Sequence, residues 1–345
     1  MLDHGGASGR ESAPGRDGAR GHARRWVRGR GWVRALLAVL VTAAVVVPLT
    51  AAVRPSIPAP APVGLAPVTA SSLEEAYAAN RANAELAAGM AAAHGDRHRA
   101  VADRALAAPS RRLLSFDGRG SGRAAEVLGD LAHADRVAVL VPGSDTSLDT
   151  YERFHAAATA LHRGLTRKTP DGTGTAVVAW LGYATPATVS TTAITSDRAE
   201  EAAPDLREFV RGLRGVTGPD PRITLLCHSY GSVVCGRAAD GLDADDLVLL
   251  GSPGTGADSA ADLRTRARVW AARGGDDWVA EVPHADVDLF GTTVGFGTDP
   301  VSPAFGARVF AAGDGGHSDY FRQGSTCLAN LVRIVLGETS EVTRA

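Results

Sequence analysis

The segment LLCHSYGSV, residues 225–233, contains a serine whose surroundings resemble those of a catalytic nucleophile. Ser229 and Gly231 match the second half of G-x-S-x-G, the turn from strand to helix that exposes a nucleophilic serine. Gly231 is expected to leave room for the helix to return past the strand. Cys227 stands where that pattern has its first glycine. A serine at a strand end is by itself more typical of a turn or a helix cap, so the rest of the chain must distinguish the two interpretations.

A serine nucleophile needs a base that accepts its proton and an acid that orients the base. Of the ten histidines, only His284 and His317 follow Ser229 in the chain. His317 lies in a Gly-rich segment between the last apolar run and the last helical stretch, and is the predicted base. His284 lies within a long connection and is interpreted as a loop or structural residue. The alternative for His317 is an exposed loop histidine.

The acid is expected in GGDDWV, which follows an apolar run ending at residue 272. Asp277 is the first candidate and Asp276 the alternative. Asp residues also cap helices, so both carboxylates have a competing structural interpretation. Because the two are adjacent, one can cap the next helix while the other orients the imidazole.

The oxyanion hole of such a site is made by two backbone N–H groups. The first belongs to the residue after the nucleophile, here Tyr230. The second is expected in the segment VPGSD, where Gly143 permits a turn and the amide of Ser144, or alternatively Asp145, faces the substrate. The side chains of these residues need not take part.

These candidates follow apolar runs that alternate with amphipathic stretches. Strands are expected at residues 111–116, 136–141, 175–181, 222–227, 246–251, 267–272 and 307–312. Helices are expected near residues 123–131, 148–165, 197–213 and 325–336, and another helix should follow Ser229 and extend to about residue 239. Several runs are apolar at successive positions, as in strands that are buried on both faces. The alternation predicts an α/β fold with a mostly parallel, doubly wound sheet. Ligands bind at the carboxyl ends of such strands, where the candidate residues gather.

The N-terminus has the pattern of a membrane anchor. Residues 1–34 contain eight Arg against three acidic residues, so with a net charge of −2 for the whole chain the remainder carries −7. The apolar run Ala35–Val53 is long enough to cross a bilayer core of ~30 Å. The basic flank predicts a cytoplasmic N-terminus and an extracytoplasmic body. The alternative is a signal peptide that is cleaved near Thr50–Ala52, after which the body would be secreted. The acidic body argues against nucleic-acid binding.

The three cysteines of an exported protein predict one disulfide and one remaining thiol. A bond between Cys227 and Cys327 is conceivable, but spacing leaves the pairing with Cys235 open. Cys227 as the nucleophile is a minor alternative. No Cys/His pattern resembles a zinc site, so we expect no metal and no cofactor.

Five segments carry a resemblance to a known family: FDGRGSGRAAEVLGDLAHADRVAVLVPGSDTSLDTY, WLGYATP, CHSYGSVV, LVLLGSPGTG and FGARVFAAGDGGHSDYF. In this order they resemble the actinobacterial α/β-hydrolase family of unknown function, over about Arg111 to Gly337. The resemblance implies the α/β-hydrolase fold, with Ser229 as nucleophile and His317 as base, and Asp277 matches the acid loop. Cys227 departs from the glycine of most α/β-hydrolases. The family implies no particular substrate.

Six segments are therefore expected along the chain. They are a basic cytoplasmic leader (1–34), a transmembrane anchor or signal segment (35–53), a Pro/Ala-rich linker (54–70), a helical extension (71–110), an α/β-hydrolase domain (111–338) and a tail (339–345). The extension should begin at a capping box formed by Ser71 and Glu74 and break near Gly95.

The predicted function is that of an extracytoplasmic serine hydrolase. It would cleave an ester, thioester or amide of a small-molecule or lipid-like acyl substrate through an acyl-enzyme. One alternative is a catalytically silent binding module at the membrane. Another is dinucleotide binding, because Gly120–Ala125 fits G-x-G-x-x-A, although no acidic residue ends the following strand to contact a ribose.

Overall fold

The computed structural model describes residues 57–64, 67–169, 172–188, 196–282, 287–289, 292–294 and 296–345. The predicted leader and the apolar run Ala35–Val53 lie outside these ranges, as does His284. Within the described ranges, no helix is both long and apolar enough to cross a membrane. The anchor therefore remains a prediction from the sequence.

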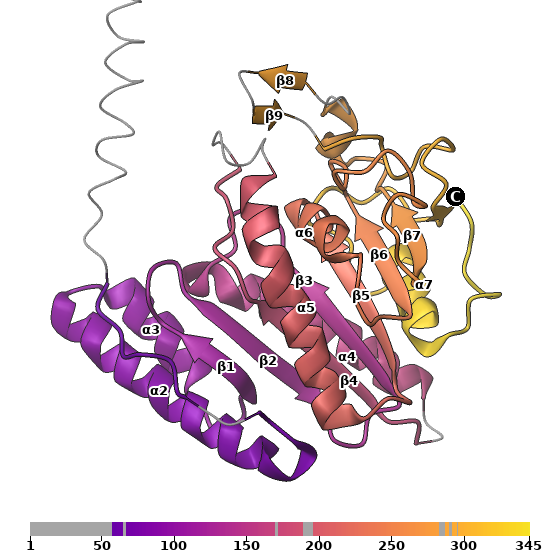
Figure 1. Ribbon diagram of the computed structural model, residues 1–345. Helices are drawn as coiled ribbons and strands as arrows, with labels where there is room; N and C mark the ends of the chain where they lie inside the picture. The colour runs from indigo at the N-terminus through magenta and orange to yellow at the C-terminus, as the bar shows by residue number, and fades with distance from the viewer. Residues whose placement is uncertain are drawn as a thin grey trace, which may run out of the picture. The chain divides into compact units, whose positions relative to one another are not determined.

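An eight-stranded sheet forms the centre of the body, in the order β1-β2-β4-β3-β5-β6-β7-β10 (Figure 1). The strands are β1 Leu113–Asp117, β2 Arg123–Gly129, β3 Arg136–Val141, β4 Thr175–Leu181, β5 Arg222–His228, β6 Asp246–Leu250, β7 Arg268–Ala272 and β10 Arg308–Val309. Strand β2 pairs antiparallel with β1 and β4, and the other neighbours pair in parallel. A separate hairpin joins β8 Val287–Leu289 to β9 Thr292–Val294. The prediction of a mostly parallel sheet is confirmed.

Helices cover both faces of the sheet (Figure 1). One face packs against α5 Asp197–Thr217 and α6 Tyr230–Ala238, and the other against α4 Tyr151–Lys168 and α7 Thr326–Leu336. Successive residues of a strand point to opposite faces, and in β3 both sets are apolar and fully buried. This two-sided burial explains the continuous apolar runs of the central strands.

The helix expected near residues 123–131 is wrong, because Arg123–Gly129 forms β2. Its Ala, Glu and Leu residues favour helix, but the segment lies between β1 and β4 and pairs with both. Glu126 is buried there, with Arg111 Nε at 2.7 Å and His155 Nδ1 at 3.0 Å from its carboxylate oxygens. Pairing with distant strands thus overrides the local helix propensity.

The hairpin between β1 and β2 also removes the basis of the dinucleotide-binding alternative. Gly120–Ala125 forms this hairpin turn and the start of β2, with positive φ angles of 62° at Gly120 and 79° at Gly122. A pyrophosphate site of the predicted type needs these glycines to lead into a helix N-terminus. The glycines here serve the turn instead.

The expected helical extension consists of α2 Leu73–His94 and α3 Arg97–Leu106. Gly95 ends α2 with a left-handed φ of 94°, so the predicted break is confirmed. The capping box is formed by Thr69 and Ser72 rather than Ser71 and Glu74, because a 3-10 turn precedes α2. Helix α2 packs along β1, the edge strand of the sheet (Figure 1).

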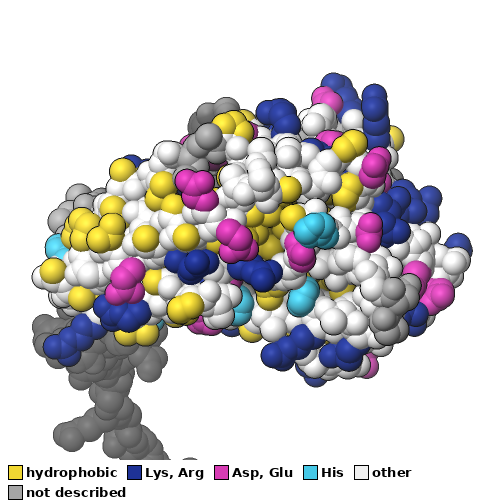
Figure 2. All heavy atoms as spheres, turned by 90° about the horizontal axis from the view of Figure 1, so that it is seen from below, with side chains coloured by type: hydrophobic (Ala, Val, Ile, Leu, Met, Phe, Trp, Pro, Cys, Tyr) yellow, Lys and Arg dark blue, Asp and Glu magenta, His cyan; other side chains and the backbone are white. Residues whose placement is uncertain are grey.

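Charged side chains of both signs share the surface. Figure 2 shows Lys and Arg side chains interspersed with Asp and Glu over most of one face. Surface ion pairs include Arg123 with Asp205 at 3.1 Å and Arg198 with Glu201 at 2.9 Å. The face in this view therefore differs from the basic stripe that is typical of nucleic-acid-binding proteins.

Candidate active site

Ser229 occupies a sharp turn between β5 and α6. Its backbone has φ 54° and ψ −127°, a conformation that costs a non-glycine residue about 1–3 kcal/mol. The Ser229 N–H donates to the Leu250 carbonyl at 2.8 Å, and the Ser229 carbonyl accepts from the N–H of Ser232 at 2.9 Å. These bonds hold the turn from both sides. The turn places Ser229 at the carboxyl end of β5.

Two glycines make room for this turn. A Cβ atom at Gly231 would lie 2.5 Å from the Pro142 carbonyl oxygen, so α6 can pass β3 only because residue 231 has no side chain. A Cβ atom at Gly143 would lie 2.5 Å from the Cβ of Ser229. The loop after β3 therefore touches the serine directly. The role predicted for Gly231 is confirmed.

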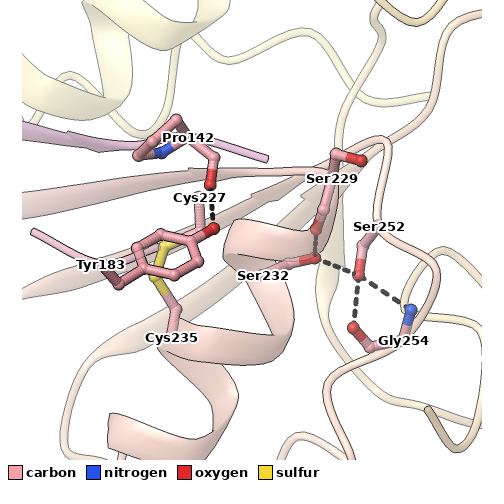
Figure 3. Close-up of a disulfide and its surroundings, with 8 residues drawn as sticks. All are labelled: Pro142, Tyr183, Cys227, Ser229, Ser232, Cys235, Ser252 and Gly254. Atoms are coloured by element: carbon pink, nitrogen blue, oxygen red, sulfur yellow. Dashed lines mark hydrogen bonds between the residues drawn. A yellow bond between two sulfur atoms is a disulfide. The ribbon is translucent and has the colours of Figure 1, made fainter. Parts of the chain in front are cut away.

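A disulfide joins Cys227 at the end of β5 to Cys235 in α6, with a Cα–Cα distance of 6.4 Å (Figure 3). Cys227 is therefore not bonded to Cys327, the pairing that was considered from the sequence. Cys327 is a buried free cysteine, and burial raises the pKa of its thiol to about 12. Cys227 has no free thiol and is no nucleophile. The disulfide crosses the elbow and links the strand before Ser229 to the helix after it.

Hydrogen bonds extend this support beneath the turn (Figure 3). Ser232 Oγ donates to the Ser229 carbonyl and lies 2.7 Å from Ser252 Oγ, which accepts from the Gly254 N–H at 3.1 Å. Beside the disulfide, Tyr183 donates its hydroxyl to the Pro142 carbonyl at 2.6 Å. The loops after β3, β4 and β6 are thus tied to the elbow.

The structure brings His317 between Ser229 and Asp277. The Nε2 atom of His317 lies 2.9 Å from Ser229 Oγ, and its Nδ1 atom lies 2.9 Å from Asp277 Oδ1. A carboxylate that accepts the Nδ1 proton leaves the Nε2 lone pair for the serine hydroxyl. The three side chains come from the loops after β5, β7 and β10. An arrangement of this kind can activate a serine as a nucleophile.

Asp277 is the carboxylate of this relay, and its side chain is fully buried. Burial acts to raise its pKa, but hydrogen bonds from His317, Tyr320 and the Val279 N–H outweigh that effect and lower the pKa. Oδ1 accepts the Val279 N–H at 2.9 Å, so Asp277 also caps the 3-10 helix Trp278–Glu281. Asp277 thus both contacts the imidazole and caps the next helix, whereas the sequence suggested that Asp276 and Asp277 divide these two roles. The alternative Asp276 is exposed.

Three aromatic side chains lie around His317 and Asp277, and sequence reasoning assigned no role to two of them, Tyr320 and His228. Tyr320 donates its hydroxyl to Asp277 Oδ2 at 2.5 Å and accepts the Gly274 N–H at 3.1 Å. The rings of His228 and Trp278 each have their centroid 4.7 Å from that of His317. In the sequence, these three residues are marked only by their proximity to the candidate site residues. Tyr320 follows His317 by three residues, His228 directly precedes Ser229, and Trp278 directly follows Asp277.

His228 supports the loop that carries His317. Its Nε2–H donates to the His317 backbone carbonyl at 2.7 Å. Burial, reinforced by the nearby charge of His317 when protonated, lowers the pKa of His228 to about 4. The ring is therefore neutral at neutral pH and holds the position of His317 without competing for its proton.

The predicted oxyanion-hole residues also lie beside Ser229. Tyr230 is the first residue of α6, where backbone N–H groups and the helix dipole favour negative charge. The Asp145 N–H donates to the Pro186 carbonyl at 3.0 Å, and its carboxylate accepts from the Thr188 N–H. Asp145 therefore anchors the loop after β4. Among the described residues the Ser144 N–H has no acceptor, so Ser144 rather than Asp145 is the candidate for the second donor.

Ser229 opens into a cleft of about 440 Å³. Its apolar wall is formed by Leu140, Phe154, Ala157, Leu226, Trp278 and Phe321. Its polar wall includes Ser144, Asp145, Thr150, Arg153 and Thr188. An apolar wall with a few polar groups is typical of small-molecule sites. Among the residues that the structure describes, no group of three or more His, Cys, Asp or Glu side chains is arranged to hold a metal ion.

Comparison with known proteins agrees with this architecture. Residues 117–287 match the family model described as alpha/beta hydrolase. An uncharacterized protein of Mycobacterium tuberculosis is 34% identical over 246 residues, which cover 63% of this chain and 37% of that protein. An uncharacterized protein of Mycobacterium bovis is 32% identical over 177 residues, covering 48% of this chain and 66% of that protein. The match thus spans little more than a third of the length of the first relative.

Among solved structures, the chain is similar to an α/β serine hydrolase without lid from Xanthomonas campestris. It is 18% identical in sequence, with a TM-score of 0.42, and the match covers 67% of this chain and 95% of that protein. An esterase, PE8, is likewise 18% identical with a TM-score of 0.40, over 62% of this chain and 97% of the esterase.

Proposed function

The chain belongs to the α/β-hydrolases, and from this premise we propose that it is a serine hydrolase that cleaves an ester, thioester or amide. The observation that carries the proposal is the unbroken series of contacts from Ser229 Oγ through the His317 imidazole to Asp277, with both distances at 2.9 Å. This geometry lets one histidine accept and return a proton while its orientation stays fixed.

The reaction proceeds in two halves. In the first, Ser229 Oγ attacks the carbonyl carbon while His317 Nε2 takes the hydroxyl proton. His317 then gives this proton to the leaving alcohol, thiol or amine as its bond to the acyl group breaks. In the second half, a water molecule gives a proton to His317 and attacks the acyl-enzyme, and the proton returns to Ser229 as the acid is released.

The negative charge that develops on the carbonyl oxygen is stabilised by backbone donors. We assign this role to the N–H groups of Tyr230 and Ser144. Each such donor contributes about 3–4 kcal/mol to the transition state in comparable sites. The strained turn at Ser229 supports the assignment, because it fixes the nucleophile beside the first amide of α6. Both donors belong to the backbone, so the Ser144 side chain is dispensable for this role.

We further propose that the hydrolase domain acts outside the cytoplasm, held by the segment Ala35–Val53 or secreted after cleavage of that segment. The basic leader before an apolar run of this length supports that topology. The disulfide between Cys227 and Cys235 also supports it, because structural disulfides persist in oxidising compartments. Within this arrangement residues 54–70 are the linker and 71–110 the helical extension.

Hydrolysis of a series of p-nitrophenyl acyl esters by the full chain tests the proposed activity. Ser229→Ala should lower kcat by at least ~10³-fold, because no other group supplies the nucleophile. Ser110→Ala is the matched control, since Ser110 is exposed and lies away from the cleft. An inactive wild-type chain would instead favour the binding module, and unchanged hydrolysis by Ser229→Ala would overturn the assignment.

A further inference from the structure

We propose that Arg153 binds an anionic group of the substrate, so that the cleft selects acyl compounds that also carry a carboxylate or a phosphate. This inference rests on the proposed hydrolase function and goes beyond it by naming the class of substrate. It follows from the position of Arg153, from its lack of a partner and from the charge of the other cleft residues.

Arg153 and Phe154 bring two kinds of chemistry into the cleft from the first turn of α4. Phe154 lies against the apolar wall together with Leu140 and Leu226, whose strands end beside Ser229. Arg153 is exposed and lines the same cleft. A substrate with an apolar chain and a charged group would match both parts of this wall.

The guanidinium of Arg153 has no partner within the protein. In the part of the chain that the structure describes, it makes neither a hydrogen bond nor an ion pair. The acidic residues near it in the chain are already engaged: Asp149 accepts from Arg99 at 2.8 Å and 3.0 Å, and Glu152 pairs with Arg111 at 3.2 Å. Arg153 is therefore available to a ligand.

The other charged side chains of the cleft do not pair with Arg153. The Asp145 carboxylate accepts from both the N–H and the hydroxyl of Thr188, so its oxygens are engaged by Thr188 rather than by Arg153. His228 is neutral at neutral pH. Arg153 is thus a cationic side chain of the cleft lining that has no partner among the described residues.

Arginine is well suited to this task. Its planar guanidinium donates two parallel N–H bonds to a carboxylate or a phosphate, and these charge-assisted bonds are stronger than neutral ones. An anion held at a fixed point on α4 would also orient the scissile carbonyl relative to Ser229, which lowers the entropic cost of reaching the transition state.

Two esters with the same chain length test this selectivity. The mono-p-nitrophenyl ester of adipate carries a terminal carboxylate, whereas p-nitrophenyl hexanoate ends in a methyl group. The wild-type kcat/KM should be about fivefold to tenfold higher for the anionic ester, as expected for a charge-assisted hydrogen bond in a partly exposed cleft. This ratio should fall to about one in Arg153→Gln and should be partly retained in Arg153→Lys. In the wild type it should also decrease at high salt.

Arg163→Gln is the matched control. Arg163 is another exposed arginine of α4, ten residues or about 15 Å further along the helix, and it does not line the cleft. Its substitution should leave the ratio between the two esters unchanged. An Arg153→Gln chain that keeps the wild-type ratio, or a wild type without preference for the anionic ester, would overturn the inference.

Binding measurements separate this inference from the proposed activity. Calorimetric titration with adipate and with hexyl phosphate needs no turnover and shows which anion the cleft prefers. Loss of binding in Arg153→Gln but not in Arg163→Gln would support the inference, even if the protein hydrolyses neither ester. In that case only the proposed hydrolase function would fail. Equal binding of both anions by the wild type and Arg153→Gln would overturn the inference even if Ser229 proves catalytic.

Discussion

Asp277 Oδ1 lies 2.9 Å from His317 Nδ1, although 40 residues separate the two in the chain. The neighbouring Asp276 is exposed to solvent and takes no part in this contact. Two adjacent acids thus have different environments, and only Asp277 lies where a carboxylate can fix the imidazole tautomer whose Nε2 lone pair faces Ser229.

Asp277→Asn should therefore lower kcat by ~10³–10⁴-fold, because an amide can donate to Nδ1 and so stabilise the wrong tautomer. Asp276→Asn is the matched control and should change kcat by no more than about twofold, as for other exposed positions. The measurement is steady-state hydrolysis of a p-nitrophenyl ester by both variants. Equal loss in the two variants would contradict the assignment of the acid.

Tyr320→Phe should lower kcat about tenfold with little change in KM, because it removes a hydrogen bond to the charged Asp277 carboxylate. That hydrogen bond lowers the pKa of Asp277, so its loss should raise the pKa and move the acid limb of the pH–kcat profile to higher pH. A pH profile of the variant checks both effects. A drop in kcat without movement of the acid limb would argue that Tyr320 acts through packing.

The stability of the protein should decrease as the pH falls from about 6.5 towards 4. In this window His228 binds a proton in the unfolded chain, where its pKa is ~6.5, but not in the folded chain, where its pKa is about 4. The full shift corresponds to ~3 kcal/mol, and because His228 keeps some exposure we expect a loss on the order of 2 kcal/mol.

His228→Gln isolates this contribution, since glutamine keeps a donor for the His317 carbonyl and does not titrate. Chemical unfolding of the wild type and the variant at pH 7 and pH 4.5 should show a smaller decrease in the free energy of unfolding for the variant. Parallel pH dependences would mean that His228 titrates alike in the folded and unfolded chains.

Reduction of the disulfide between Cys227 and Cys235 should lower the free energy of unfolding by about 2–3 kcal/mol, as expected for a closed loop of this length. Since the bond joins the two elements that meet at Ser229, kcat should decrease as well. Unfolding curves and ester hydrolysis, each with and without reductant, give the two values. The reductant should have no further effect on Cys227→Ala/Cys235→Ala.

Thiol titration provides an independent check of this pairing. The denatured chain should present one thiol before reduction, that of Cys327, and three after it. Three thiols in the denatured chain before reduction would contradict the disulfide, and so would a modified Cys227 in a peptide digest of the unreduced protein.

The sequence was sufficient to predict the structure where the local pattern of residues and the tertiary environment favour the same arrangement. The continuous apolar runs of β3, β4 and β5 predicted a buried parallel sheet, and Gly231 predicted a close approach of α6 to β3. The order of Ser229, Asp277 and His317 predicted three side chains at one edge of that sheet. These inferences used the period of a strand, the requirement for space at a single residue, and the position of residues directly after strands of a parallel sheet.

The errors arose where distant contacts decide the outcome. Residues 123–129 have helix-forming side chains, and only their pairing with β1 and β4 makes them a strand. The partner of Cys227 depends on how α6 packs beside β5, which spacing does not encode. The hydrogen bond from Tyr320 to Asp277 joins two loops 43 residues apart, so neither periodicity nor a motif indicates it.

The most direct test of the central claim, that Ser229 is a nucleophile activated by His317, is covalent labelling with a fluorophosphonate probe followed by peptide mass spectrometry. We expect stoichiometric label on the peptide that contains Ser229, no label in Ser229→Ala, and strongly slowed labelling in His317→Ala. A wild-type chain that resists the probe while folded, or one whose label persists in Ser229→Ala, would contradict the account.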